Sequence, residues 1–549
     1  MTDLIAHTLR GSWTADPHPL PDRLLRLLRA RTGVTPTPAA PSVSVPPSRL
    51  SPDAVSELAA IVGADNVLLD DESRLGRSAG LSYVDLMRHR SGSVDAPDAV
   101  VLPADSAAVA EVVVACDRLR VAVVPFGGGT SVVGGVAPVG GSVPVAGSVP
   151  VGGSASVPVV AVDLVRLDRL VSVDRESRLA VLQAGVRGPD AERLLAANGF
   201  TLGHVPQSFE RATIGGFAAT RSAGQASSGY GRFEDMVVGL RVATPRGEWR
   251  LGVAPASAAG PDLRALVVGS EGAFGIIMEV TVRVRPAPTH RRYEAYVFDG
   301  WSRGVDAVRA LAQSRTSATV TRLSDVDETA VMLASSAAEP LVRGYLRARG
   351  VAEPCLLVLG WEAVGAAELA RARRATMRSL RGHRFVRLGR APGEAWRRSR
   401  FGGPRQRDAL LDVGVCVETL ETATYWSTLS ALRDAVRTAL AGALDDPMVM
   451  CHVSHAYETG ASLYFTVLAP RSQDDPIGQW QRAKTAASEA ITSLHDGTPM
   501  GTITHHHAIG VDHARYLPTE VGPVGMEVLR AVKHALDPNN TLNPTKLIQ

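Results

Sequence analysis

The sequence predicts an α+β protein in which a glycine-rich part is followed by a part with longer helices and strands. A chain of 549 residues is too long for one compact core, so we expect two or three domains. Glycine-rich turns that follow short apolar strands lie within residues 96–288. From residue 289 these turns cease, and longer helical segments occur among strands, which favours a sheet covered by helices.

Residues 1–50 are expected to lead into the folded part. Proline, alanine and serine dominate residues 35–48, which predicts a mobile segment. The preceding arginine–leucine run, Arg23–Arg29, predicts a short amphipathic helix that docks on the body of the protein, with a lipid surface as the alternative. Residues 51–95 then form a helical segment, whose first helix is capped by Ser51 and ended by Gly63.

Strands and helices alternate from Asp98 onward. We expect a strand at residues 99–102, a helix at residues 106–119 and a strand at residues 121–124. The glycine-rich stretch that follows consists of Pro125, Phe126, Gly127, Gly128, Gly129, Thr130 and Ser131. Glycine lets backbone N–H groups approach a phosphate and the two hydroxyls add donors, so this is a candidate diphosphate-binding turn, with an ordinary turn as the alternative. The motifs typical of nicotinamide and ATP sites are absent from the sequence.

Residues 136–159 form a low-complexity insertion. The sequence Gly-Ser-Val-Pro-Val occurs at residues 141–145 and again at residues 147–151. Proline and glycine at this density interrupt helices and strand ladders, so we expect a flexible surface loop that arose by neutral expansion, with a lid over the site as the alternative. A strand at residues 159–163 follows the insertion.

Two later segments contain further glycine-rich turns. The first includes Pro206, Gln207, Ser208, Phe209, Glu210, Arg211, Ala212, Ala219, Thr220, Arg221 and Ser222. The second includes Ser270, Glu271, Gly272, Ala273, Phe274, Gly275 and Ile276, and continues into a strand at residues 280–284. Together with residues 125–131, they resemble in order and spacing the three FAD-contacting stretches of the vanillyl-alcohol-oxidase (PCMH) type of flavoprotein. The resemblance implies a two-subdomain FAD-binding domain at residues 96–288 and assigns these residues to contacts with noncovalently bound FAD.

Other stretches resemble the alkyldihydroxyacetonephosphate synthase family within that superfamily. They are residues 204–208, 406–408, 418–422, 463–465, 505–507 and 537–540. The resemblance implies a cap domain of antiparallel sheet and helices at residues 289–500. It also implies that residues 501–549 return to the FAD domain.

The resemblance implies a flavoenzyme of ether-lipid synthesis with a lipid-like or small anionic substrate. Such an enzyme exchanges the acyl group of an acyl-dihydroxyacetone phosphate for a fatty alcohol through an adduct at flavin N5, without net redox change. An FAD-linked oxidase or dehydrogenase of a D-2-hydroxyacid or related alcohol is the main alternative, and a flavin-binding protein without catalysis is a further one. Such dehydrogenases typically read Gly-Glu-His-Gly-Ile-Gly where residues 505–510 here read His-His-His-Ala-Ile-Gly.

The triplet His505, His506 and His507 is a candidate site for holding an anion or moving protons near neutral pH. On an extended segment, His505 and His507 would face one wall and His506 the other. A metal cluster and a solvated surface tract are the alternatives. No carboxylate or cysteine lies within a few residues to complete a set of metal ligands, which argues against the cluster.

The family resemblance also assigns roles to single residues. Tyr464 matches the family's catalytic tyrosine, Arg407 matches its substrate-binding arginine, and Arg322 matches another functionally important arginine. The expected catalytic set is therefore Tyr464, Arg322 and the histidine triplet. A tyrosine that only packs its ring in the cap and an arginine in a surface ion pair are the alternatives. Tyr457 is a second candidate for the catalytic tyrosine, because the sequence around it differs from the sequence typical of the family.

Composition limits the partners and the location. The net charge is only +3 and no dense basic stripe occurs, so nucleic acid is not an expected partner. No apolar run reaches ~18 residues and no secretion signal is visible, so we expect a cytoplasmic protein, with peripheral membrane contact and a homodimer as further options. The cysteines are spaced like isolated core thiols of a reducing compartment: Cys116, Cys355, Cys416 and Cys451.

Overall fold

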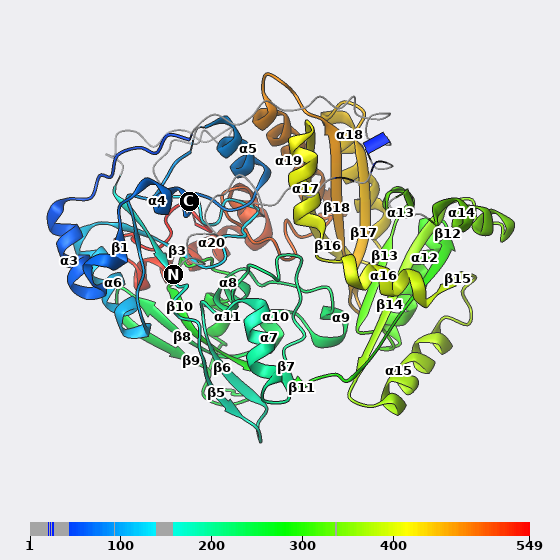
Figure 1. Ribbon diagram of the computed structural model, residues 1–549, viewed down its shortest axis with the longest axis horizontal. Helices are drawn as coiled ribbons and strands as arrows, with labels where there is room; N and C mark the ends of the chain where they lie inside the picture. Colours follow the sequence, from blue (N-terminus) through cyan, green and yellow to red (C-terminus); the bar gives the residue numbers. More distant parts are fainter. Residues whose placement is uncertain are drawn as a thin grey trace.

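The computed structural model describes residues 20, 22, 25–26, 43–92, 94–138, 157–334 and 338–548. Figure 1 shows an N-terminal part, coloured blue to green, beside a cap coloured green to orange. The predicted insertion falls largely on residues 139–156, and most of the predicted lead-in falls on residues 1–42; both lie outside the described residues apart from the few positions named above. Of these positions, Leu20 and Leu25 pack against the hydrophobic core of the cap.

The first sheet of the N-terminal part has four strands. In spatial order they are β1 (Val67–Leu68), β2 (Ala99–Val101), β4 (Val159–Asp163) and β3 (Ala122–Phe126). The last three are parallel, and every residue of β4 is buried, as expected for a parallel strand at the centre of an α/β layer. Helix α6 (Ser106–Leu119) connects β2 to β3 and starts at Asp105, whose side chain accepts the N–H of Ala108.

The second sheet of this part is antiparallel. In spatial order its strands are β5 (Leu170–Asp174), β6 (Leu179–Gln183), β10 (Ile276–Arg283), β8 (Val237–Thr244) and β9 (Gly247–Leu251). A short pair, β7 (Phe200–Thr201) and β11 (Arg285–Pro286), lies at its side. The two sheets correspond to the two predicted subdomains.

Short helices complete the N-terminal part. They are α3 (Pro52–Val62), η1 (Ala64–Asn66), α4 (Asp71–Leu75), α5 (Tyr83–Ser91), α7 (Gly188–Ala196), α8 (Ile214–Ala219), α9 (Ser227–Tyr230), α10 (Phe233–Met236) and α11 (Arg264–Val267). Helix α3 confirms the predicted caps, because the Ser51 side chain accepts from the N–H of Ala54 and Gly63 has a φ of 88°. Helix α8 begins at Thr213, whose side chain accepts the N–H of Gly216.

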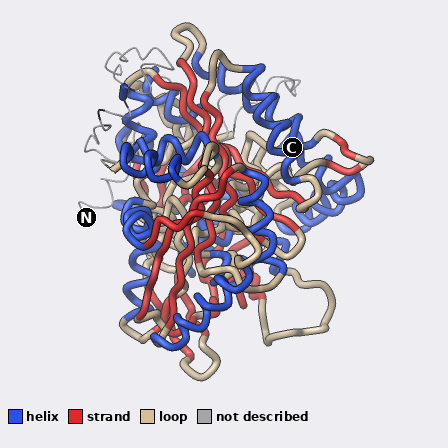
Figure 2. The backbone as a smooth tube through the Cα atoms, turned by 90° about the vertical axis from the view of Figure 1, so that its right-hand side faces the viewer, coloured by secondary structure: helices blue, strands red, loops and turns tan. Residues whose placement is uncertain are grey.

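The cap is built on one seven-stranded antiparallel sheet. In spatial order its strands are β15 (Val386–Gly389), β12 (His290–Asp299), β14 (Pro354–Ala363), β13 (Val320–Ser324), β17 (Met448–Ala456), β18 (Gly460–Pro470) and β16 (Val415–Tyr425). Its helices are α12 (Trp301–Gln313), α13 (Val326–Ala334), α14 (Glu339–Ala348), α15 (Ala366–Ser379), α16 (Arg390–Ser399), α17 (Gly403–Asp412), α18 (Leu429–Ala443) and α19 (Pro476–Thr492). Figure 2 shows the strands inside the molecule with helices outside them.

The C-terminal segment packs on the N-terminal part. After the hairpin of β19 (Leu494–His495) and β20 (Thr498–Pro499), a loop leads to η2 (Ala514–Tyr516) and α20 (Leu517–Leu536), the red helix of Figure 1. Leu542 then forms a parallel bridge with Val123 of β3. The chain therefore extends its first sheet with residues that come more than four hundred positions later.

Two further expectations concern the whole chain. All four cysteines are buried and free, which confirms their prediction as isolated thiols. Among the described residues, no helix combines the length and the apolar composition that crossing a membrane requires.

Candidate active site

The first and second glycine-rich stretches pack backbone against backbone. A Cβ atom added to Gly128 would lie 2.2 Å from the carbonyl oxygen of Arg211, and one added to Gly127 would lie 2.5 Å from Oγ1 of Thr213. Side chains at these positions would push the two stretches apart. The glycines are therefore needed for contact between protein segments, a reason that the sequence did not reveal.

The third glycine-rich stretch contacts the second through backbone hydrogen bonds. The N–H groups of Gly269 and Glu271 donate to the carbonyl oxygens of Ala218 at 3.0 Å and Ala219 at 2.9 Å. The C-terminal Asn543 then joins the first and third stretches, because its Nδ2 donates to the carbonyl oxygens of Gly135 at 3.0 Å and Glu271 at 2.6 Å. The three predicted stretches thus converge on one place in the fold.

This place fits a cofactor that carries phosphates. Among the described residues, Oγ of Ser270 and Oε1 of Glu271 are buried without a hydrogen-bond partner. The other carboxylate oxygen of Glu271 accepts the N–H groups of Ile509 at 3.0 Å and Gly510 at 2.7 Å. Burial raises the pKa of Glu271 to about 7, although these N–H groups oppose the shift. Burial thus favours the protonated carboxyl, which can donate to an anionic oxygen.

Some side chains assigned to FAD have partners in the protein. The pairs are Phe209 stacked on Phe401, Glu210 with Arg405 and Arg221 with Glu234. Two of these pairs connect the second stretch to the segment that forms and precedes α17 of the cap. The side chain of Arg221 is half-exposed and faces Glu234, so the structure gives it a role in the protein that the resemblance did not indicate.

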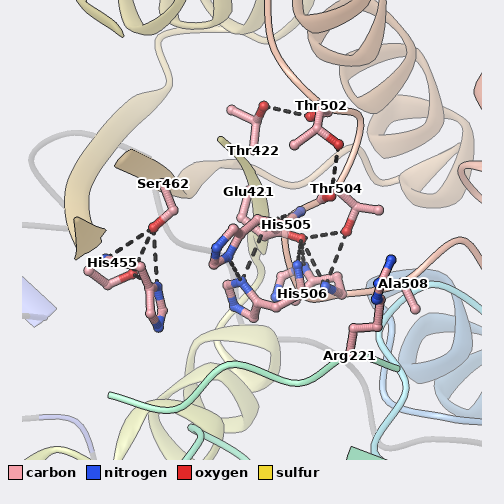
Figure 3. Close-up of polar contacts among 12 residues, drawn as sticks. Arg221, Glu421, Thr422, His455, Ser462, Thr502, Thr504, His505, His506 and Ala508 are labelled. Atoms are coloured by element: carbon pink, nitrogen blue, oxygen red, sulfur yellow. Dashed lines mark hydrogen bonds and ion pairs between the residues drawn. The ribbon is translucent and has the colours of Figure 1, made fainter. Parts of the chain in front are cut away.

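Glu421 on β16 holds the loop that carries the histidine triplet (Figure 3). Its carboxylate accepts the N–H groups of His505 at 2.7 Å, His506 at 3.1 Å and His507 at 2.9 Å, and the hydroxyl of Thr504 at 2.6 Å. Three successive N–H groups reach one carboxylate only where the backbone curls. The prediction that His505 and His507 face one wall and His506 the other is therefore wrong. Instead, Nδ1 of His505 lies 2.9 Å from Nδ1 of His506.

The carboxylate and the imidazoles determine each other's charge. Burial opposes ionisation of Glu421, but the three imidazoles and a threonine hydroxyl hold its pKa well below the ordinary value. Burial lowers the pKa of His505 strongly, that of His506 to about 3 and that of His507 to about 4. At neutral pH the loop therefore presents neutral imidazoles, which can accept a proton as well as donate one.

Tyr464 on β18 packs its ring between two imidazoles. In the sheet it lies beside Glu421 of β16 and His452 of β17. Its ring stacks on His452 at 4.9 Å and on His506 at 5.9 Å between centroids, and His507 meets its edge at 5.6 Å. Burial raises the pKa of Tyr464 to about 12, so the hydroxyl keeps its proton at neutral pH. The structure thus brings the predicted tyrosine and the triplet together.

Arg322 lies on β13, which is separated from the strand of this tyrosine by β17. Its Nη2 is 2.8 Å from Oε1 of Glu328 and 3.0 Å from Nδ1 of His452. Because His452 stacks on Tyr464, Arg322 reaches the site through that imidazole. The structure thus connects Arg322 to the tyrosine through His452, and its assignment as catalytic stays a prediction. Its ion pair lies largely inside the protein, so the alternative of a surface ion pair is wrong.

Arg407 on α17 faces the same site. Its guanidinium lies 3.7 Å from Oε1 of Glu418, and its Nε is buried without a hydrogen-bond partner among the described residues. Burial is the main cause that lowers the pKa of His507, and the charge of Arg407 adds to it. A buried guanidinium with a spare N–H can bind an oxyanion.

Two family models match the chain. The model described as FAD binding domain matches residues 137–251, and the one described as FAD linked oxidases, C-terminal domain, matches residues 287–547. These matches cover much of the glycine-rich part and nearly all of the cap and the C-terminal segment. FAD is therefore the cofactor of this protein.

Named relatives extend over nearly the whole chain. The alkyldihydroxyacetonephosphate synthase of Dictyostelium discoideum is 31% identical over 531 residues, which cover 94% of this chain and 84% of that protein. The chain belongs to the alkyldihydroxyacetonephosphate synthase family. A solved structure of alkyldihydroxyacetonephosphate synthase superposes on this family member with a TM-score of 0.80 at 29% identity, covering 97% of this chain and 94% of that one.

The fold of this synthase-family flavoenzyme also extends beyond the family. The structure of p-cresol methylhydroxylase with bound substrate is 16% identical and has a TM-score of 0.64, over 92% of this chain and 98% of that one. This likeness confirms the predicted α+β fold of the PCMH type with its cap. It concerns the fold alone.

Sequence reasoning missed several residues that build the site in this synthase-family protein. Glu421 lies in a stretch that carried the resemblance, but nothing in the sequence showed that it accepts the N–H groups of the triplet. His452 and His455 also belong to the site, since His452 stacks on Tyr464 and His455 packs on His505 with 4.9 Å between ring centroids. The signal available in the sequence was the presence of these two histidines in the segment that forms β17.

Three imidazoles of this family member lie close enough to share a metal ion. The ligand nitrogens of His455, His505 and His506 all lie within 4.8 Å of one another. The lack of nearby ligands in the sequence was therefore a poor argument against a metal cluster, because His455 comes from β17. However, Nε2 of His455 is 2.9 Å from the carbonyl oxygen of Gly224, and its Nδ1 is 3.2 Å from Oγ of Ser462. These contacts favour a hydrogen-bonded network.

Proposed function

We propose that this protein exchanges the acyl group of an acyl-dihydroxyacetone phosphate for a fatty alcohol, with noncovalently bound FAD. The named relatives support this reaction. The observation that carries the proposal is the packing of Tyr464 against His506 and His507 near Arg407. The exchange needs groups that move a proton and a fixed cation for an anionic substrate, and these residues supply both.

The chemistry of the exchange defines what the side chains must do. Substrate and product each carry two hydrogens on C1, so a proton that leaves this carbon to labilise the acyl oxygen must be replaced. Neutral His506 and His507 are suited to accepting that proton, whereas Tyr464, which keeps its hydroxyl proton, is suited to donating one. When bound, FAD would supply an isoalloxazine ring able to stabilise C1 during the exchange of its oxygen substituents.

Arg407 completes the proposed site. Its planar guanidinium can bind the phosphate or the departing carboxylate through two parallel hydrogen bonds, which a lysine cannot do. The ion pair with Glu418 is long enough, at 3.7 Å, to leave the guanidinium available to a substrate anion. Noncovalent attachment of FAD is supported by the assigned FAD residues, because neither histidine nor cysteine occurs among them.

Anaerobic turnover tests the reaction. Purified holoprotein is mixed with palmitoyl-dihydroxyacetone phosphate and hexadecanol in the absence of an electron acceptor. We expect ether product and free palmitate in equal amounts, with the flavin oxidised in the steady state. A parallel mixture of D-lactate and a dye tests the dehydrogenase alternative. Product that forms only in proportion to an added acceptor contradicts the proposal.

Acid precipitation tests the attachment of the cofactor. We expect a yellow supernatant that contains FAD and a colourless protein pellet. Flavin that remains in the pellet after washing shows a covalent bond and contradicts this part of the proposal.

A further inference from the structure

A chain of three titratable groups leads away from the site, and the proposed function uses only its inner end. The hydroxyl oxygen of Tyr457 lies 2.7 Å from Nε2 of His505, and Nδ1 of His505 lies 2.9 Å from Nδ1 of His506. His506 in turn stacks on Tyr464. Tyr457 is only half-buried and lies at the turn between β17 and β18, next to the exposed Glu458.

We propose that Tyr457, His505 and His506 form a path that carries protons between the reacting carbon and the solvent. The proposal rests on the proposed function for its substrate. Its geometry is a property of the protein and is the same whichever substrate binds. Tyr457 is therefore the outer end of the path, and His506 is the inner end.

The contacts allow a proton to leave in four transfers. His506 takes the substrate proton on Nε2 and passes the proton of its Nδ1 to Nδ1 of His505. His505 passes the proton of its Nε2 to the oxygen of Tyr457, whose hydroxyl proton goes to water. Each imidazole ends neutral with its proton on the other nitrogen, and no electrons are exchanged with an acceptor.

Return of a proton to C1 runs the same transfers in reverse. The second pass restores the original tautomers, so a reaction that releases one proton and takes one back resets the path. The exchange proposed above has this balance, because C1 has two hydrogens before and after.

The residues around the path favour transfer of a proton along it over a state in which one imidazole remains protonated. Burial lowers the pKa of His505 strongly and that of His506 to about 3, which disfavours an imidazolium at either position. The guanidinium of Arg232 lies beside the imidazole of His505 and lowers its pKa further, after burial. Nη2 of Arg232 donates to the carbonyl oxygen of His505 at 2.8 Å. Arg232 and Glu421 both hold the backbone of residue 505, so these contacts persist when the side chain is replaced.

Solvent deuterium tests the path. Wild-type holoprotein in D₂O should form ether product with deuterium at C1. Tyr457→Phe keeps the ring and removes the hydroxyl, so we expect unchanged FAD content and melting temperature, and turnover lower by about tenfold. The deuterium per product molecule should also fall several-fold, because the proton then returns to the carbon from which it came. His505→Gln should have the same effects.

Tyr425→Phe is the matched control. Tyr425 ends β16 with its side chain exposed, and we expect wild-type turnover and deuterium content in this variant. Unchanged deuterium per product in both Tyr457→Phe and His505→Gln would overturn the path, even if turnover fell, because a lower rate alone indicates a structural role.

A substrate-free measurement separates failure of the path from failure of the proposed function. If wild-type protein forms no ether product, the proposed function fails, and the path is then tested by ¹⁵N NMR of the holoprotein with labelled histidines. We expect that one Nδ1 of the pair His505 and His506 carries a proton and the other does not. Both atoms protonated, or neither, would overturn the path.

Discussion

At the scale of single residues, Glu421 determines the shape of the histidine loop. It is buried and accepts three successive N–H groups and one hydroxyl. An amide at this position has only one acceptor oxygen, and its NH₂ group would face backbone donors. The loop therefore depends on a carboxylate rather than on a polar side chain of similar size.

We expect Glu421→Gln to lower the free energy of unfolding by about 3 kcal/mol, since charge-assisted hydrogen bonds in the interior are lost. Turnover should fall by ~10²-fold or more, because the imidazoles no longer have fixed positions. Chemical denaturation and the turnover assay measure the two effects. Glu458→Gln, at the exposed turn of β17 and β18, should change stability by less than ~0.5 kcal/mol. A Glu421→Gln protein with wild-type stability would show that the loop has another support.

Tyr464→Phe isolates the hydroxyl of the predicted catalytic tyrosine. The phenyl ring can keep its place between His452 and His506, so we expect normal FAD content and an unchanged melting temperature. Turnover should fall by roughly 10²–10⁴, the range for a lost general acid or base. Steady-state kinetics check this. A larger loss in Tyr457→Phe than in Tyr464→Phe would exchange the roles of the two tyrosines.

The sequence predicted these residues unevenly, for physical reasons. Tyr464, Arg407 and the triplet carry functional groups in stretches that resemble the family, so the sequence was sufficient to name them as candidates, and the structure brings Tyr464 and the triplet together. The role of Glu421 depends on backbone N–H groups 84 to 86 positions later, and only the folded loop brings them together. The contact between Arg322 and His452 could not be predicted for the same reason, because the pairing of β13 with β17 brings these two residues together.

At the scale of elements, the turn at residues 127–129 owes its glycines to a neighbouring segment. A Cβ on Gly128 would lie 2.2 Å from one backbone atom of Arg211 and 2.8 Å from Cα of Ala212. Backbone atoms cannot move aside as the end of a flexible side chain can. The turn and the second glycine-rich stretch therefore act as one unit.

We expect Gly128→Ala to lose FAD and to be less stable than wild type by about 1–3 kcal/mol, the usual range for overpacking. Absorbance of the purified protein and thermal unfolding measure these effects. Gly442→Ala is the control, because this glycine lies in α18 with open space around its Cβ position. It should be neutral or stabilising by up to about 1 kcal/mol. Full FAD content in Gly128→Ala would mean that the turn can shift without harm.

Individual elements were more predictable than their arrangement. The helix predicted at residues 106–119 is α6, and the strand predicted at residues 159–163 is β4, with the same bounds. Local signals suffice there, because a capping side chain and an apolar run are read within a few positions. The seven-stranded order of the cap pairs β13 with β17 across more than a hundred residues, and no local signal contains that pairing.

At the scale of the whole molecule, buried neutral histidines make the fold sensitive to acid. The pKa values are about 3 for His204, His455 and His506 and about 4 for His507 and His513, with burial as the main cause in each case. An unfolded histidine has a pKa of about 6.5. Between these values the unfolded chain binds more protons than the native one, so the free energy of unfolding falls as the pH falls.

We therefore expect a melting temperature that is nearly constant above pH ~7 and falls steeply below pH ~6.5. Each such histidine contributes a slope of up to about 1.4 kcal/mol per pH unit in this window. Thermal unfolding from pH 8 to pH 5 measures the slope. His507→Gln should reduce this slope by the contribution of one histidine. A flat profile between pH 7 and pH 5 would show that these imidazoles are solvated in the native protein.

The bridge between Val123 and Leu542 has a consequence for biosynthesis. The N–H of Val123 donates to the carbonyl oxygen of Thr541, and the N–H of Asn543 donates to that of Val123, so strand β3 acquires its second neighbour only from a late segment. Asn543 also joins two of the glycine-rich stretches to each other. A nascent chain therefore lacks the second neighbour of β3, and the side chain that joins the two stretches, until residues 541–543 have been synthesised. We therefore expect stable flavin binding only after these residues have emerged from the ribosome.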